Sequence, residues 1–210
     1  MRVLIGCECS GTVREAFRAR GHDAWSCDLL PAEDGSPFHY QADALEVLRQ
    51  PFDLLIAHPP CTRLCNSGVL RLYRGGKKAN GIDPEKWREM LAGVVFFNAL
   101  WRAPIKRKCL ENPIMHGHAA QLIVAKRSQI IQPWQFGEDA SKTTGLHLEG
   151  LPLLQPTSKK SGRIVNGRER WSNQTDSGQN RLGPSPTRAA ERARTYPGIA
   201  AAMAAQWSIP

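Results

Sequence analysis

Residues 52–68, with the sequence FDLLIAHPPCTRLCNSG, decide how the rest of the chain is interpreted. The apolar run 54–57 predicts a short buried strand, and Pro59 and Pro60 cannot continue a strand ladder beyond it. Cys61 therefore follows the point where the chain leaves the sheet, and open α/β sheets bind their ligands at that edge. Cys61 is a candidate nucleophile on this ground. The alternative is a small buried apolar residue, which is what most free cysteines are.

Length and composition favour one intracellular domain. The chain has 210 residues, which suits a single domain. It has no apolar run long enough for a membrane span, and its apolar start is too short for a signal peptide. All six cysteines lie in the first 110 residues, which favours reduced thiols. No CxxC pair occurs, so a zinc site is not favoured and no metal is predicted.

The net charge is +9, from 28 Lys and Arg against 19 Asp and Glu. Residues 151–210 carry nine of the basic and only three of the acidic residues. A basic segment that also contains Trp171 suits a polyanionic partner. On composition alone, a solvated and partly disordered tail explains the same segment equally well.

The predicted elements of the N-terminal residues come in the order found in a nucleotide-binding α/β sheet: strand, glycine turn, helix, strand and acidic residue. A strand at 2–5 leads into the small-residue turn GCECSG at 6–11, and a helix at 12–20 ends at Gly21. A second strand at 23–27 is followed by Asp28, whose carboxylate can accept hydrogen bonds from a ribose diol. The turn is not GxGxxG, so NAD is not favoured. Asp43 follows as either the N-cap of a short helix ending near 48 or an acceptor for an adenine amine.

The middle of the chain alternates core elements with a basic loop. Residues 70–84 combine two adjacent glycines with four cations, which is typical of a mobile loop that closes over phosphates or of a plain solvated loop. Residues 84–101 have the periodicity of a core helix. A strand at 108–113 then places Glu111 near its tip, where a carboxylate has to be paired or functional.

The last third is expected to be less regular. A short helix at 118–125, a strand at 128–131, a turn at 134–137 and another strand within 142–154 are predicted. Residues 155–186 are rich in Ser, Gly, Asn and basic residues, which predicts a long irregular loop with local disorder. Helix returns from 188 to 207, and Ile199, Met203 and Trp207 form an apolar stripe that should pack on the sheet.

Taken in order, these motifs resemble those of DNA cytosine-5 methyltransferases, particularly the short forms of phages and prophages. The resemblance covers residues 2–155 and 188–207, and its motifs are the turn at 6–11, Asp28, Asp43, PPC at 59–61, EN at 111–112 and RARTYPGI at 192–199. The chain departs from the family in a turn with fewer glycines and in Glu-Asn-Pro for Glu-Asn-Val. Only the irregular segment 155–186 occupies the place of the family's target-recognition domain. Recognition of a DNA sequence by this protein should therefore be short or weak.

The resemblance implies a Rossmann-like S-adenosylmethionine-dependent methyltransferase fold with a mostly parallel central sheet. It divides the chain into a catalytic core at 1–154, an irregular basic segment at 155–187 and a C-terminal helix at 188–210 that completes the core. It also implies a monomer in the cytoplasm of a bacterium or a phage-infected cell, acting without a membrane on a cytosine flipped out of double-stranded DNA.

The resemblance also implies roles for individual residues. Cys61 would add as a thiolate to C6 of cytosine, Glu111 would bind the base at N3 and the exocyclic amine, and a cation would lower the pKa of Cys61. The candidates for that cation are Arg63, Arg192 and Arg194. The expected cofactor contacts are Gly6, Cys7, Glu8, Cys9, Ser10, Gly11, Asp28, Leu29, Asp43, Ala44 and Pro59. The expected DNA contacts are Arg63, Arg71, Arg74, Lys77, Lys78, Arg168 and Arg170.

Three other classes compete with this interpretation. Amino-group methyltransferases end the same strand with Asp or Asn, two prolines and an aromatic ring, whereas His58 and Cys61 hold those positions here. An enzyme acting on RNA or a free nucleotide would explain the missing recognition domain, although the basic C-terminal segment argues against a free nucleotide. A non-catalytic nucleic-acid-binding protein would not need Cys61 and Glu111 together. Cys61 is preferred to Cys65 as the nucleophile, because the two prolines constrain its backbone and Cys65 lies in a polar run expected to be flexible.

Overall fold

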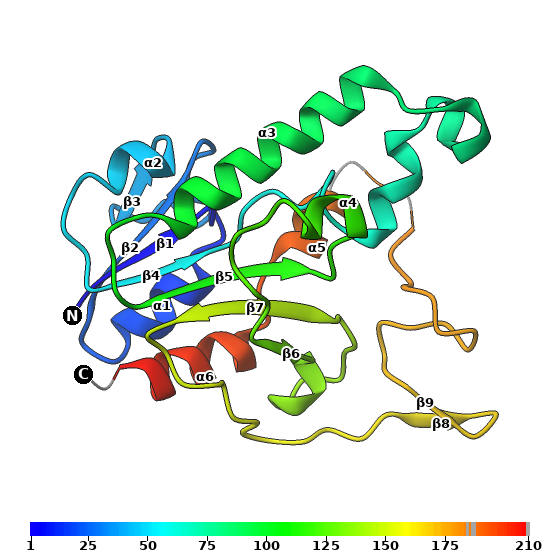
Figure 1. Cartoon of the computed structure of the whole chain (residues 1–210). Helices are drawn as coiled ribbons and strands as arrows, with labels where there is room; N and C mark the ends of the chain where they lie inside the picture. Colours follow the sequence, from blue (N-terminus) through cyan, green and yellow to red (C-terminus); the bar gives the residue numbers. More distant parts are fainter. Residues whose placement is uncertain (184, 186–187, 209–210) are drawn as a thin grey trace.

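The computed structural model describes residues 1–183, 185 and 188–208, and a seven-stranded sheet forms its centre (Figure 1). The sheet order is β3-β2-β1-β4-β5-β7-β6, in which β1 to β5 pair in parallel and β7 runs antiparallel to both of its neighbours. The strands are β1 Arg2–Gly6, β2 Asp23–Asp28, β3 His39–Gln41, β4 Leu54–Ala57, β5 Lys108–Pro113, β6 Gln129–Ile131 and β7 Thr144–Glu149. This confirms the predicted Rossmann-like α/β class with a mostly parallel sheet.

Helices cover both faces of the sheet. Figure 1 shows α3 (Pro84–Trp101) on one side of the sheet and α6 (Pro197–Trp207) on the other. Val3 and Ile5 of β1 pack with α1 (Thr12–Arg18) and α6, whereas Leu4 packs with α2 (Ala44–Val47) and α3. Burial of both faces explains why the central parallel strands are continuously apolar in sequence.

The connections reverse direction at β1, which lies between β2 and β4. The chain moves outward from β1 to β2 and β3 and then returns to the other side of β1 with β4. In doubly wound sheets this switch point is where the loops at the carboxyl ends of the strands separate and leave room for a ligand. The loops after β1 and β4 carry the two motifs that the sequence singled out.

Three predicted elements agree closely with the structure. The strands at 54–57 and 108–113 and the helix at 84–101 have the expected bounds. Asp83 caps α3 by accepting hydrogen bonds from the amides of Glu85 and Lys86, and Pro84 occupies its first turn. Within the described part of the chain, no helix is long and apolar enough to cross a membrane.

Two predicted helices are shorter than expected. The helix expected at 12–20 ends at Arg18, because Gly21 turns the chain with a φ of +81°. The helix expected at 118–125 is α4, Gly117–Ala120. The Asn98 side chain on α3 binds the carbonyl of Leu122 and the amide of Val124, at 2.9 Å and 3.0 Å, and holds that backbone outside a helix.

The segment 155–187 is not irregular throughout, so that expectation is wrong for its central part. Strands β8 (Arg163–Val165) and β9 (Arg168–Arg170) form an antiparallel hairpin. Asn166 and Gly167 turn it with φ values of +49° and +72°, as a two-residue hairpin turn requires. Trp171 follows, 9% exposed and stacked on Trp134 with 5.4 Å between the ring centres. Residues 184, 186 and 187 of this segment, and 209–210 of the predicted C-terminal part, lie outside the described residues.

The end of the chain is helical as expected, in two pieces. Helix α5 (Arg188–Ala193) stops before Tyr196 and Pro197, and α6 begins at that proline. Ile199, Met203 and Trp207 are buried in the core, as the predicted apolar stripe requires.

Candidate functional site

The loops after β4 and β5 meet at one edge of the sheet. The parallel register pairs Ala57 with Leu110, so His58 and Glu111, the next residues along, fall opposite each other. The side chain of Asn112 donates to the carbonyl of Pro59 at 3.2 Å and fixes the start of the loop that carries Cys61. The two proline-ended motifs of the sequence therefore form one site.

Glu111 is buried and paired at this edge. His58 Nδ1 donates to Glu111 Oε2 at 2.7 Å, and each side chain is only 10% exposed. Among the described residues, His58 Nε2 and Asn112 Oδ1 are the buried side-chain atoms without a hydrogen-bond partner. Unpartnered polar atoms in a buried position suggest that a bound molecule completes their hydrogen bonds.

Lys142, just before β7, supplies the positive charge at this site. Burial raises the pKa of Glu111, but the Lys142 ammonium and the hydrogen bond from His58 outweigh burial, so the pKa lies below its usual value. Lys142 also acts to lower the pKa of Cys61. Its Nζ donates to the carbonyl of Arg194 at 3.2 Å, which ties the end of α5 to the same place.

The loop that carries the two cysteines is firmly held, contrary to the expectation of a flexible run. Leu64 is fully buried, Cys65 is 7% exposed, and Cys65 forms a β-bridge with Met115. The amide of Cys65 donates to the carbonyl of Cys61 at 3.1 Å, which closes one turn between the two thiols. His116 adds two hydrogen bonds to the same loop.

The two thiols share a hydrogen bond and titrate together. That bond, followed in importance by burial, raises the pKa of Cys61 well above its usual value. The same bond, with help from the Ser67 hydroxyl and the amides of residues 67 and 68, lowers the pKa of Cys65 to about 5. The first proton lost from the pair therefore leaves the charge on Cys65, while Cys61 keeps its proton.

The arginines expected to lower the pKa of Cys61 are directed elsewhere, so that expectation is corrected. Arg63 pairs with Glu89 on α3, and Arg194 pairs with Glu33 in the loop after β2. Arg192 is exposed on α5. The cation that acts to lower the pKa of Cys61 is Lys142 instead, whereas Cys65 raises it.

The predicted cofactor turn lies at the neighbouring strand end. Cys7 has a φ of +58°, which is strained for a residue other than glycine and common at functional sites. Burial and the charges of Asp28, Cys27 and Asp43 raise its pKa to about 12, so the two predicted acids lie near the turn. Leu29 beside them is 73% exposed.

Several residues in this turn also have structural roles. Glu8 is 6% exposed, and its carboxylate accepts hydrogen bonds from the amides of Val13 and Arg14 at the start of α1. Asp43 caps α2 by accepting from the amide of Leu45 at 2.9 Å, so the capping role left open in the sequence is present. The predicted positions Gly6, Gly11, Ala44 and Pro59 are buried around the turn, while Cys9 and Ser10 are half-buried.

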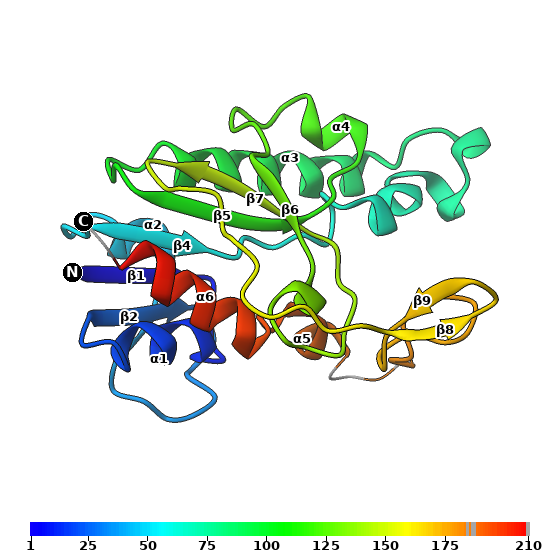
Figure 2. The same ribbon diagram turned by 90° about the horizontal axis from the view of Figure 1, so that it is seen from below.

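The predicted DNA-binding cations lie on two projections. Arg71, Arg74, Lys77 and Lys78 are exposed on the short 3₁₀ turns between residues 66 and 80. Arg168 is exposed on β9, and Arg170 is half-buried there. Figures 1 and 2 place both projections on the same side of the molecule, the side toward which β4 and β5 point in Figure 1.

Three residues at this edge were not among the predicted site residues: His58, Lys142 and Asn112, the last of which was named only as part of the EN motif. The signal for His58 was available, because it follows the buried strand β4 while Glu111 lies near the end of β5, and neighbouring parallel strands end at the same edge. Lys142 carries no local signal, since only tertiary packing brings the start of β7 to this place.

Comparisons with known proteins find similarity among solved structures but none among sequences. No family model matches the chain, and no curated protein sequence matches it. One similar solved structure, from E. coli, is described as a DNA modification methyltransferase encoded within a prophage; it is 14% identical over 75% of this chain, with a TM-score of 0.47. Another is MtNAS in complex with MTA and tNA, 12% identical over 70% of this chain, with a TM-score of 0.36. The chain spans about half the length of each, 51% and 52%.

Proposed function

We propose that this protein transfers a methyl group from S-adenosylmethionine to C5 of cytosine in DNA, through a covalent adduct between Cys61 and C6 of a flipped base. The observation that carries the proposal is the meeting of Cys61 with the buried Glu111–His58 pair at one strand edge. A nucleophile beside a carboxylate and two unpartnered polar atoms matches the needs of a pyrimidine ring, which must be held by its edge and attacked at C6.

The chain supplies a group for each proton that moves. When the Cys61 sulfur adds to C6, its proton passes to the Cys65 thiolate along their shared hydrogen bond. Electrons of the C5–C6 double bond move toward N3, which takes up a proton from the Glu111–His58 pair. C5 then accepts the methyl group, and the donor sulfur keeps the electron pair of the broken S–CH₃ bond. C5 loses its own proton to solvent and N3 returns its proton to the Glu111–His58 pair. The Cys61 sulfur leaves with its electron pair and recovers its proton from Cys65.

The residues around the first strand end fit the proposed cofactor. Asp28 and Asp43 offer carboxylates to a ribose diol and an adenine amine, and exposed Leu29 offers an apolar surface to the adenine ring. The carboxylate of Glu8 already occupies the start of α1, so the negatively charged end of a cofactor would have to bind elsewhere along the turn. S-adenosylmethionine would supply an electrophilic methyl group on its sulfonium.

The first experiment tests substrate and product together. Duplex DNA, single-stranded DNA and RNA, each containing cytosine, are incubated with the protein and S-adenosylmethionine, and their nucleosides are analysed by mass spectrometry. 5-Methylcytosine in the duplex supports the proposal. Product in RNA alone would favour an enzyme of the same chemistry acting on RNA, and methylation at the exocyclic amine would defeat covalent C5 chemistry.

The second experiment tests the nucleophile. Duplex DNA carrying 5-fluorocytosine should become trapped on the protein, because the fluorine at C5 cannot leave as a proton does. The adduct should form with the wild type and, more slowly because the Ser hydroxyl is a much weaker base than the Cys65 thiolate, with Cys65→Ser, but not with Cys61→Ser. Cys61→Ser should also abolish methyl transfer while cofactor binding stays nearly unchanged. An adduct that maps to Cys65 by peptide mass would refute the assignment.

A further inference from the structure

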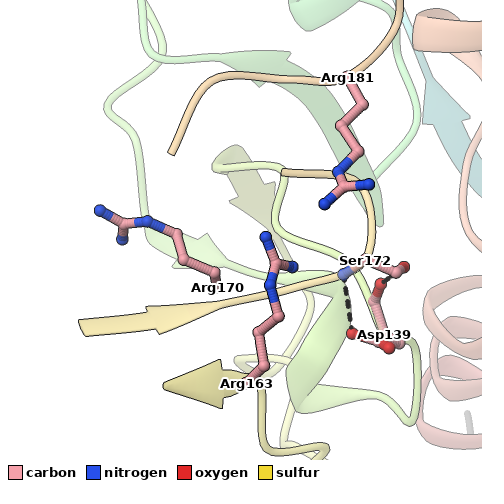
Figure 3. Close-up of a pocket in the computed structure, with 5 residues that line it drawn as sticks. All are labelled: Asp139, Arg163, Arg170, Ser172 and Arg181. Atoms are coloured by element: carbon pink, nitrogen blue, oxygen red, sulfur yellow. Dashed lines mark hydrogen bonds between the residues drawn. The ribbon is translucent and has the colours of Figure 1, made fainter. Parts of the chain in front are cut away.

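A cavity of about 300 Å³ lies outside the candidate site, between the hairpin β8–β9 and the segment that follows it. Three arginines line it, together with Asp139 and Ser172. Arg163 comes from β8, Arg170 from β9 and Arg181 from the loop beyond them. Figure 3 shows Arg163 and Arg181 pointing toward each other over Ser172, with Arg170 directed outward at the rim.

Backbone carbonyls hold each guanidinium in place. Arg163 donates to the carbonyls of Trp171 and Gln174, both at 2.9 Å. Arg181 donates to the carbonyl of Gln174 at 2.8 Å, and Arg170 to that of Asp176 at 3.1 Å. The three side chains are therefore already ordered, and binding an anion would lose little conformational entropy.

The three positive groups all act on one carboxylate, that of Asp176. Arg163 pairs with the Asp176 carboxylate at 2.8 Å. The hydrogen bond from Arg163, and then the charges of Arg163, Arg181 and Arg170, lower the pKa of that carboxylate. Asp176 is 74% exposed, so it can yield its place to another anion. Residues 155–183 carry six Lys and Arg against two Asp and Glu, so the positive charge continues past the cavity, as a polymeric anion would need.

Hydrogen bonds join this cavity to the candidate site. The amide of Ser172 donates to the Asp139 carboxylate at 3.0 Å. Asn173 accepts from the amide of Ser141 and donates to its carbonyl, both at 2.9 Å. Ser141 directly precedes Lys142, whose ammonium acts on Glu111. A molecule held in the cavity is therefore placed relative to the Glu111 edge.

We propose that Arg163, Arg170 and Arg181 bind a backbone phosphate of the DNA that carries the target base. Guanidinium groups match phosphate through paired N–H donors. The position of the target rests on the proposed function, whereas phosphate binding itself does not. The phosphate would replace Asp176 as the partner of the arginines and would set the register of the duplex without reading its sequence.

The test measures binding without catalysis. A fluorescent duplex that contains no cytosine is titrated by anisotropy at several salt concentrations, in the absence of S-adenosylmethionine. Arg181→Gln should lower the slope of log K against log salt by about 0.9, the value for one phosphate contact. Arg181→Lys, which keeps the charge but not the paired donors, should restore the slope and recover only part of the affinity. Arg20→Gln, an exposed arginine at the other end of the strands, serves as the control and should leave the slope unchanged.

Two outcomes would overturn the proposal. One is an Arg181→Gln variant, folded by circular dichroism, that keeps the full salt slope. The other is inorganic phosphate binding to the wild type but not to Arg181→Gln while both bind the duplex equally, which would assign the cavity to a free anion. Because the duplex has no cytosine, a failure of methyl transfer would not change these results. If Arg181→Gln does not fold, Asp176→Asn provides the converse test and should strengthen duplex binding.

Discussion

At the scale of single residues, Glu111, His58 and Lys142 form a charge arrangement that no local sequence pattern contains. They come from the ends of β5 and β4 and from the start of β7. Glu111 stays ionised in a buried place because a cation and a hydrogen-bond donor both face it. The arrangement leaves His58 Nε2 available to a ligand.

Replacing Lys142 by methionine should raise the pKa of Glu111, because burial then acts without its main opposing charge. The Glu111 pKa can be followed by NMR of ¹³C-labelled glutamate. A folded pKa below the unfolded one stabilises the protein above about pH 4.5, and that contribution is lost as the pH falls through the folded value. Lys142→Met should therefore be less stable than the wild type at pH 7, with the difference shrinking in acid. Lys126→Met, at an exposed lysine, is the matched control, and an unchanged Glu111 pKa in Lys142→Met would contradict the assignment.

At the scale of elements, apolar runs and capping residues predict where a helix or strand begins and ends, provided that no contact from elsewhere in the fold opposes them. The apolar run of β4 and the capped, periodic helix α3 were predictable from sequence for this reason. The early end of α4 was not, because Asn98 acts on it from another helix. The hairpin β8–β9 has a signal in Asn166-Gly167, which the surrounding polar composition masks. Within the site, Cys61 could be predicted from its place after β4 and Glu111 from its place near the end of β5, but the interaction between Cys61 and Cys65 depends on the folded turn.

The loop of residues 61–68 is an element whose shape should control activity. A Cβ at Gly68 would lie 2.5 Å from the carbonyl oxygen of Thr62, so the backbone beside Cys61 would have to move. Gly68→Ala should lower kcat/KM by about 10²-fold, the order of loss that a small displacement at a reacting atom causes. Gly117→Ala is the control, since a Cβ there meets nothing within 4 Å. Equal activity of the two variants in a methyl-transfer assay would show that the loop tolerates the shift.

At the scale of the whole molecule, two basic projections flank the edge where β4 and β5 end. One comprises the 3₁₀ turns of residues 66–80, and the other is the hairpin β8–β9 with its cavity (Figures 1 and 2). They are far apart in sequence and face the same side. A nucleic acid at that edge could contact both, which no single motif in the sequence predicts.

Substitution of Lys77 and Lys78 tests whether the first projection, residues 66–80, binds phosphate, and it does so independently of the cavity. Changing both to alanine should weaken binding to all duplex sequences alike and lower the salt slope by up to about 1.8, because each lysine neutralises at most one phosphate. The measurement is the same anisotropy titration with duplexes of different sequence. Lys106→Ala, exposed before β5, is the control. A loss confined to one sequence would indicate base contact rather than phosphate contact.

Helix α6 packs against β1, so the first strand of the chain is covered by one of its last helices. The Trp207 indole donates to the carbonyl of Pro152 at 3.1 Å, and Arg107 donates to the carbonyl of Trp207 at 2.7 Å. A ribosome adds about 5–20 residues per second, so Val3 and Ile5 wait on the order of 10–40 s after their synthesis before α6 can cover them. During that interval one apolar face of the sheet is open to water, and a chaperone that binds apolar strands during translation should therefore raise the yield of native protein.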